Sequence, residues 1–225
     1  MSVPFKLVIK LATPFVMGRT RTTLDGLLSA AVFKETGLMD KDTFAHIPLE
    51  RGEGGIFKAS CMFVHGIFTH EVVGRVMGLR GRSDLDEVLF SPNSKAGTRY
   101  LAVDTARGPY KSNMSNYQGV NARTVVFFGV GDPERVVQLI ENNIIGIGKR
   151  SNAGAGQISS VHWEPVTEDW SWVTPGGKPA RPLPLAIWNK ISASRDVPIS
   201  QVTVQIPYWD VVKAVEAVHP VDLTL

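Results

Sequence analysis

The sequence predicts an α+β fold in which helices cover an antiparallel sheet. Three observations lead to this prediction. Two stretches of the chain each follow the order strand, helix, strand; residues 66–121 separate these stretches; and a Trp- and Pro-rich segment follows from residue 168. With 225 residues the chain can bury a sizeable core without disulfides or metals.

The first stretch begins with the β-rich run 5–11, which predicts a strand ending at Thr13-Pro14. A helix is expected next, because Thr23 can cap it and Gly37 can stop it. Its apolar residues recur at helical spacing: Leu24, Leu27, Leu28, Ala31 and Val32. Residues 56–64 then predict the second strand.

The second stretch repeats this order. Residues 122–130 are almost continuously apolar at their centre and predict a strand, and residues 157–163 predict another. Between them, Asp132, Pro133 and Glu134 supply the cap, first-position proline and acidic first turn of a helix. The complete order is that of a modified ferredoxin-like core, a split βαβ arrangement also described as RRM-like.

Two further regions complete the predicted organisation. The core occupies residues 1–167 and includes a long insertion at 66–121, a length that is usually functional or mobile in compact domains. Residues 168–225 form a C-terminal extension that we expect to pack on the core. Within the extension, the sequence predicts a strand over 202–206 and a helix over 209–218.

Composition points to a folded cytoplasmic protein. The net charge is +3, and the chain has neither an apolar run of membrane-spanning length nor a signal-peptide pattern at its start. A membrane partner is therefore not expected. Cys61, the only cysteine, lies in an apolar alternation and predicts a buried structural thiol.

A glycine-rich loop at residues 146–156 (GIGKRSNAGAG) is the most informative segment. Its four glycines, Gly146, Gly148, Gly154 and Gly156, allow the backbone to approach a ligand closely. Lys149 and Arg150 add positive charge beside backbone amides, and Asn152 adds a polar amide, a combination suited to phosphates. A flexible turn with two solvated cations is the competing interpretation.

Two familiar phosphate motifs are excluded for this loop. A Walker loop requires glycine five residues before the Gly-Lys pair, but Asn143 stands there, and Arg150 replaces the required Ser or Thr. A dinucleotide fingerprint follows a strand and opens a helix, whereas this loop follows a predicted helix and enters a strand.

Basic residues also gather elsewhere. Arg19 and Arg21, with the hydroxyls of residues 20, 22 and 23, precede the first helix and suit phosphate positioning, although a solvated basic turn is equally consistent. In a split βαβ fold this loop and the glycine loop can approach one another. The insertion holds seven basic and five acidic residues, and Arg107, Lys111 and Tyr117, with Arg123 in the next strand, are candidate RNA contacts. A plain surface hairpin is the alternative.

No catalytic set is evident in the sequence. The five histidines are scattered, and no metal-ligand spacing or nucleophile motif occurs, so we expect neither a metal, nor a cofactor, nor an enzyme. His46 or His65 could still act as the general base of a metal-independent endoribonuclease.

The segments 24–31 (LDGLLSAA) and 152–158 (NAGAGQI) resemble the RAMP superfamily of CRISPR-associated proteins. Over roughly residues 1–165 the chain is similar to the small subunit of type IV CRISPR effector complexes that caps the 5′ handle of the guide RNA. The resemblance implies a ferredoxin-like fold, a thumb within residues 66–121 and a glycine loop at 146–156.

The expected function is therefore that of an RNA-binding structural subunit in a ribonucleoprotein for antiviral defence. By the resemblance, its partners are the guide RNA, the larger RAMP backbone subunits whose filament it anchors, a large subunit and, indirectly, target DNA. The guide-maturing endoribonuclease is the first alternative. An unrelated module that binds a phosphate ligand is the second.

Overall fold

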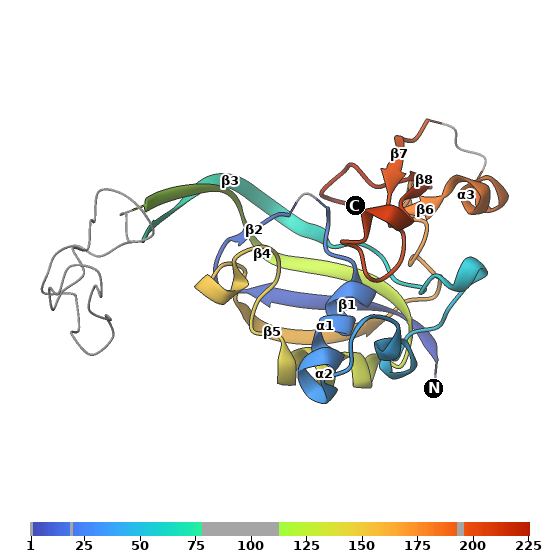
Figure 1. The fold of residues 1–225 in the computed structure, drawn as a ribbon, viewed down its shortest axis with the longest axis horizontal. Helices are drawn as coiled ribbons and strands as arrows, with labels where there is room; N and C mark the ends of the chain where they lie inside the picture. The colour runs from blue at the N-terminus through green and yellow to red at the C-terminus, as the bar shows by residue number, and fades with distance from the viewer. Residues whose placement is uncertain (1, 19, 78–112, 193–195) are drawn as a thin grey trace, which may run out of the picture. The chain divides into compact units, whose positions relative to one another are not determined.

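The computed structural model describes residues 2–18, 20–77, 113–192 and 196–225 (Figure 1). The chain divides into two compact units, Met1–His70 with Gly119–Leu225, and Glu71–Gln118. No helix in these described ranges is long and apolar enough to cross a bilayer.

The larger unit is built on a sheet whose strands come from both halves of the chain. Strand β1 pairs with β4 on one side and with β5 on the other, both antiparallel, while β2 and β3 pair with β4. The strands are β1 (Val3–Leu11), β2 (Phe15–Val16), β3 (Phe63–Met77), β4 (Asn113–Gly131) and β5 (Ile158–Pro165).

Two helices lie on the same face of this sheet, α1 (Leu24–Thr36) and α2 (Pro133–Asn143) (Figure 1). Both predicted caps are confirmed: Thr23 Oγ1 accepts from the Gly26 amide, and Asp132 accepts from the Arg135 amide. The main core lies between helices and sheet, because β1 turns alternate residues toward one face. It includes Phe5, Leu7, Ile9, Leu24, Leu28, Val136, Leu139 and Ile140.

The other face of the sheet is covered by the C-terminal segment. Val8, Val126 and Phe128 on this face pack against Ala180 and Trp170. The remaining elements are a second sheet in the order β6 (Leu183–Pro184), β8 (Val215–Val218) and β7 (Ile199–Val202), and helix α3 (Leu185–Ile191). Short 3-10 turns occur at Asp40–His46, Glu53–Gly55, Ser151–Ala153 and Val211–Lys213.

The predicted strand over 56–64 is wrong. Phe57, Ala59 and Cys61 form single bridges to three different partners, Arg51, Gly129 and Thr23, and so share no continuous ladder. The strand begins instead at Phe63 and continues to Met77, inside the segment assigned to the insertion. Similarly, β4 begins at Asn113, earlier than predicted.

The predicted elements of the extension also differ. Strand β7 ends at Val202, while Val204 and Ile206 are buried in different clusters without continuing it. The predicted helix over 209–218 is a short turn at Val211–Lys213 followed by β8. Its valines favour extended backbone because β-branched side chains restrict the helical rotamers. Helix α3 was not predicted.

Candidate nucleic-acid interface

Two loops of the larger unit, residues 12–18 and 144–157, are joined by hydrogen bonds. The Lys149 amide donates to the Val16 carbonyl at 2.7 Å, and the Gly156 amide donates to Pro14 at 2.8 Å. The Thr13 hydroxyl donates to the Gly154 carbonyl at 2.7 Å. The expected approach of the first loop and the glycine loop is therefore confirmed.

Two of the loop glycines make this approach possible. Gly148 has φ +85°, and a Cβ built there would lie 2.6 Å from the Val16 oxygen. Gly156 has φ +61°, and its Cβ would lie 2.1 Å from the Ile147 oxygen. A side chain at either position would be strained and would collide with backbone, so only glycine permits this junction.

A pocket of about 450 Å³ opens between the first loop, α1 and the glycine loop. Gly146 and Gly148 form part of its wall. Its polar side chains are those of Thr20, Thr22, Lys34, Lys149 and Ser151, and none of the described residues lining it is acidic. Hydroxyls and ammonium groups are typical partners of phosphate oxygens.

Lys34 is a member of this pocket that the sequence analysis missed. Gly26, Ala30 and Lys34 line the pocket together because residues four apart share one helix face. The Lys34 Nζ also donates to the Asn143 carbonyl at 2.8 Å, which ties α1 to the end of α2. The regular spacing of these three residues was the signal available in the sequence.

Arg150 and Asn152 lie exposed in the part of the glycine loop beyond Lys149. Arg150 has φ 67°, a left-handed conformation uncommon outside glycine. Its carbonyl accepts from the amides of Ala153 and Ala155, at 2.8 and 3.3 Å. These bonds close a tight turn. The side chains of Arg150 and Asn152 therefore extend from the same glycine loop that lines the pocket.

Arg21 lies elsewhere. Its guanidinium donates to the Val221 carbonyl and stands 5.7 Å from the centre of the Phe63 ring. Burial lowers the pKa of this guanidinium, opposed by the Cys61 and Asp222 groups. Arg21 is therefore packed against the C-terminal segment, and it is not among the residues that line the pocket.

Among the other candidates, the described residues Arg123 and Tyr117 do not line the pocket. Arg123 is exposed on β4, and Tyr117 is partly buried on the portion of β4 that belongs to the smaller unit. Arg19, Arg107 and Lys111 lie outside the described residues.

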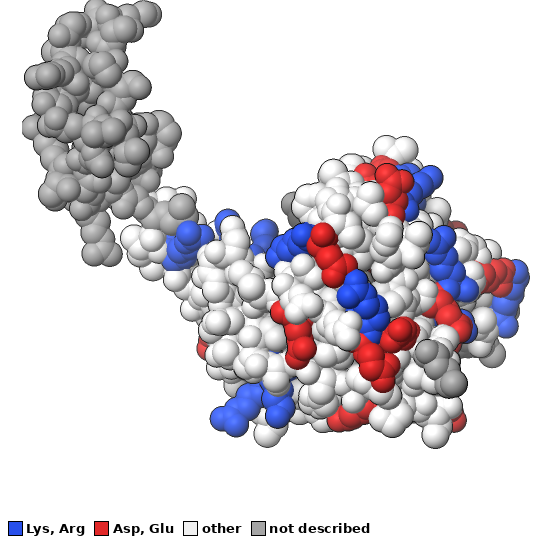
Figure 2. Space-filling model, turned by 90° about the horizontal axis from the view of Figure 1, so that it is seen from below, with Lys and Arg blue, Asp and Glu red and all other residues white. Residues whose placement is uncertain are grey.

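Charge on the face shown in Figure 2 is mixed, with acidic and basic side chains interspersed. Several of the described cations are neutralised by ion pairs, such as Lys58 with Glu50 and Lys190 with Glu53. Any attraction of a polyanion would thus depend on a local group of cations rather than on net charge.

A buried polar cluster connects α1 to the C-terminal segment. The Arg181 guanidinium donates to the Asp25 carboxylate at 3.3 Å and to the Tyr208 hydroxyl at 2.6 Å, and that hydroxyl donates to Asp25 at 2.7 Å. Burial alone would lower the pKa of Arg181, but the Asp25 carboxylate raises it above its ordinary value. Burial raises the pKa of Tyr208. The cluster fixes residues 206–208 beside the first turn of α1.

Three observations on the described residues bear on catalysis. His46 and His65 are both exposed, on different elements. No three His, Cys, Asp or Glu side chains among the described residues are grouped to hold a metal ion. Burial raises the pKa of the Cys61 thiol to about 12, so this buried cysteine is not an activated nucleophile.

The fold and the pocket define an α+β protein whose candidate site presents hydroxyls, cations and a glycine loop. Residues 3–220 match the model of the family described as CRISPR type IV associated protein Csf3. The chain therefore belongs to this family, which confirms the type IV CRISPR resemblance predicted from the sequence. A search of curated proteins found no match.

Proposed function

We propose that this type IV CRISPR-associated protein is a non-catalytic RNA-binding subunit of the effector complex. It holds the 5′ handle of the guide RNA and anchors the filament of larger backbone subunits. The observation that carries the proposal is the junction of the two loops, through which Lys149 joins Thr20, Thr22 and Ser151 around one pocket. Membership of the family supports the CRISPR context.

The fold proposal is a modified ferredoxin-like core. Along the chain the elements run β1, α1, β3, β4, α2, β5, and across the sheet β1 lies between β4 and β5 while β3 pairs with β4. Both helices pack on one face through a shared core. This is the order and layering expected of a split βαβ arrangement, to which β2 and the C-terminal sheet are added.

Phosphate contacts in the pocket predict a specific dependence of affinity on salt. Lys149→Ala with Arg150→Ala should weaken binding of single-stranded repeat RNA. It should also reduce the slope of log affinity against log salt by about 1.4, because each single-strand phosphate contact contributes about 0.7. Filter binding over a salt series measures both quantities.

The matched control removes two cations away from the loop. Lys190→Ala with Lys213→Ala makes the same change in net charge, and both side chains are exposed and paired with acidic residues. This control should leave the affinity and the slope near those of the unaltered protein. Equal losses in the two double variants would show that the glycine loop is not the RNA interface.

A further inference from the structure

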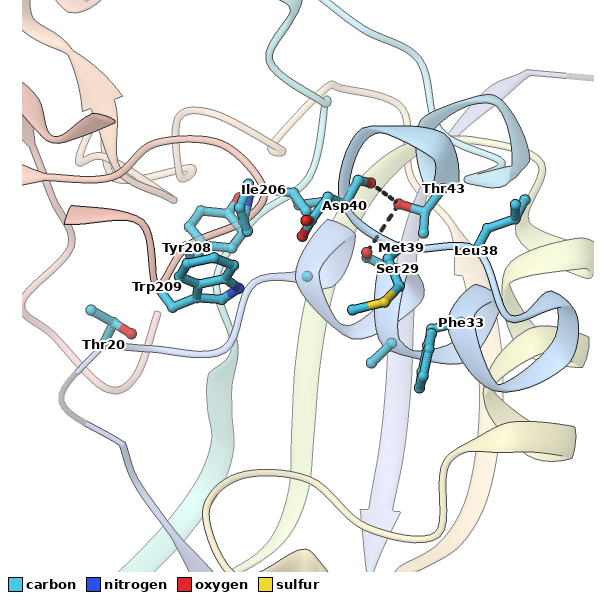
Figure 3. Close-up of a pocket in the computed structure, with 13 residues that line it drawn as sticks. Thr20, Ser29, Phe33, Leu38, Met39, Asp40, Thr43, Ile206, Tyr208 and Trp209 are labelled. Atoms are coloured by element: carbon cyan, nitrogen blue, oxygen red, sulfur yellow. Dashed lines mark hydrogen bonds between the residues drawn. The ribbon is translucent and has the colours of Figure 1, made fainter. Parts of the chain in front are cut away.

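A second pocket, of about 490 Å³, shares lining residues with the cation-lined one. Figure 3 shows the side chains that line this second pocket. Its walls come from α1, from the segment 38–43 that follows this helix, and from the C-terminal segment 206–209. Both pockets are lined by Thr20, Gly26 and Ala30, so they meet across the first loop and one face of α1. Its volume lies in the range of about 300–1,000 Å³ usual for small-molecule sites.

Aromatic rings occupy one end of this second pocket. Figure 3 shows Trp209 beside Tyr208 at that end, with Phe33, Leu38 and Met39 opposite. Trp209 is 75 % exposed, although indole rings in folded proteins are usually well covered. Tyr208 is held by its bonds to Asp25 and Arg181, so the segment carrying Trp209 is anchored next to the helix.

Polar groups lie between the two apolar ends. The Ser29 and Thr43 hydroxyls are 3.0 Å apart, and Thr43 donates to the Asp40 carbonyl at 2.6 Å. The exposed Asp40 side chain lies between the aromatic end and Met39 in Figure 3. A carboxylate here would repel a phosphate but complements an exocyclic amino group, as acidic side chains do with cytosine N4.

We infer that the second pocket receives one unstacked base of the bound RNA, its face on Trp209 and its amino edge toward Asp40. This inference rests on the proposed function and deepens it. The argument is the continuity of the pockets: a phosphate at Thr20 and Lys149 places the attached nucleoside within reach of the adjoining aromatic wall. Single-strand recognition commonly combines a cationic groove with such an aromatic platform.

The test compares three probes of equal length on the full chain: an oligocytidine, an oligouridine and an abasic ribose-phosphate oligomer. Trp209→Ala should reduce affinity for oligocytidine about 5- to 150-fold, the effect of losing one stacked base, and leave affinity for the abasic oligomer unchanged. Trp209→Phe keeps a ring and should retain most of the affinity. Asp40→Asn should diminish the preference for oligocytidine over oligouridine.

Val212→Ala is the control, since Val212 is 89 % exposed and lies outside the pocket. Equal effects of Trp209→Ala on oligocytidine and on the abasic oligomer, or no effect on either, would overturn the inference. If Lys149→Ala with Arg150→Ala still weakens binding of oligocytidine and of the abasic oligomer, the proposed function stands even though the inference about the second pocket has failed. If Trp209→Ala leaves the affinity for RNA unchanged but disrupts binding of another subunit, the pocket is a protein interface and the inference is wrong.

Discussion

Cys61 is a buried thiol whose pKa is influenced by two cations. It is 1 % exposed, and burial raises its pKa to about 12 from an ordinary value of 9.0, although Arg181 and Arg21 oppose this shift. Burial raises the pKa of Tyr208 in the same region. Both groups therefore remain protonated in the folded protein at pH values where they ionise in the unfolded chain.

This difference predicts loss of stability at alkaline pH. Between about pH 9 and 12 the unfolded chain binds fewer protons than the folded one, so the free energy of unfolding falls as pH rises. Below pH 9 the thiol is protonated in both states, and the contribution of Cys61 to the free energy of unfolding is fully present. Denaturant titrations across this window should give a shallower pH dependence for Cys61→Ala. An unchanged slope in that variant would mean that Cys61 does not ionise on unfolding.

Residue-level reasoning succeeded where a side chain acts on its own backbone. Thr23 and Asp132 cap helices because their oxygens accept from amides three residues later, a pattern visible in sequence. It failed for Arg21, whose partners Val221 and Phe63 are distant in the chain. It also missed Trp209, because its exposure depends on the buried Asp25–Arg181–Tyr208 cluster that no local pattern reveals.

The two main helices differ in how they connect to the sheet. Gly131, just before α2, pairs with Val3 at the start of β1, whereas the loop leading to α1 follows the other end of β1. Only α1 lines the two pockets. Both helices have a side-chain N-cap, but only the capped end of α1 belongs to the candidate RNA site.

This placement gives a paired prediction. Thr23→Ala and Asp132→Ala should each lower the free energy of unfolding by about 1 kcal/mol, the usual effect of losing an N-cap. Only Thr23→Ala should also weaken RNA binding, because the first turn of α1 borders both pockets. Denaturant unfolding and filter binding measure the two effects. Equal RNA affinity in both variants would separate α1 from the interface.

Among the elements, those with strong local patterns were predicted and those set by pairing were not. Strand β1 and helices α1 and α2 follow from alternation, helical spacing and capping residues. The lengths of β3 and β4 could not be predicted, because polar residues such as Asn113 and Asn116 continue a strand only when a partner strand pairs with them.

For the molecule as a whole we predict RNA binding without cleavage. Labelled repeat RNA incubated with the purified protein should remain intact with or without EDTA, and EDTA should not change its affinity. The physical reason is that the described residues offer no grouped metal ligands and that the buried Cys61 thiol is not an activated nucleophile. Specific cleavage that His46→Ala or His65→Ala abolishes, with folding retained, would establish the endoribonuclease alternative.

Under the proposed function, the bond between Lys149 and Val16 also sets when during synthesis the chain acquires its candidate phosphate pocket. Its two residues are far apart in the chain, and Gly156 must also reach Pro14 before the loops are closed. Chains emerge from the ribosome N-terminus first, at about 5–20 residues per second. A nascent chain that has exposed α1 but not yet the glycine loop has no complete phosphate pocket. We therefore expect guide RNA to be captured by chains in which the glycine loop has emerged and not by shorter translation intermediates.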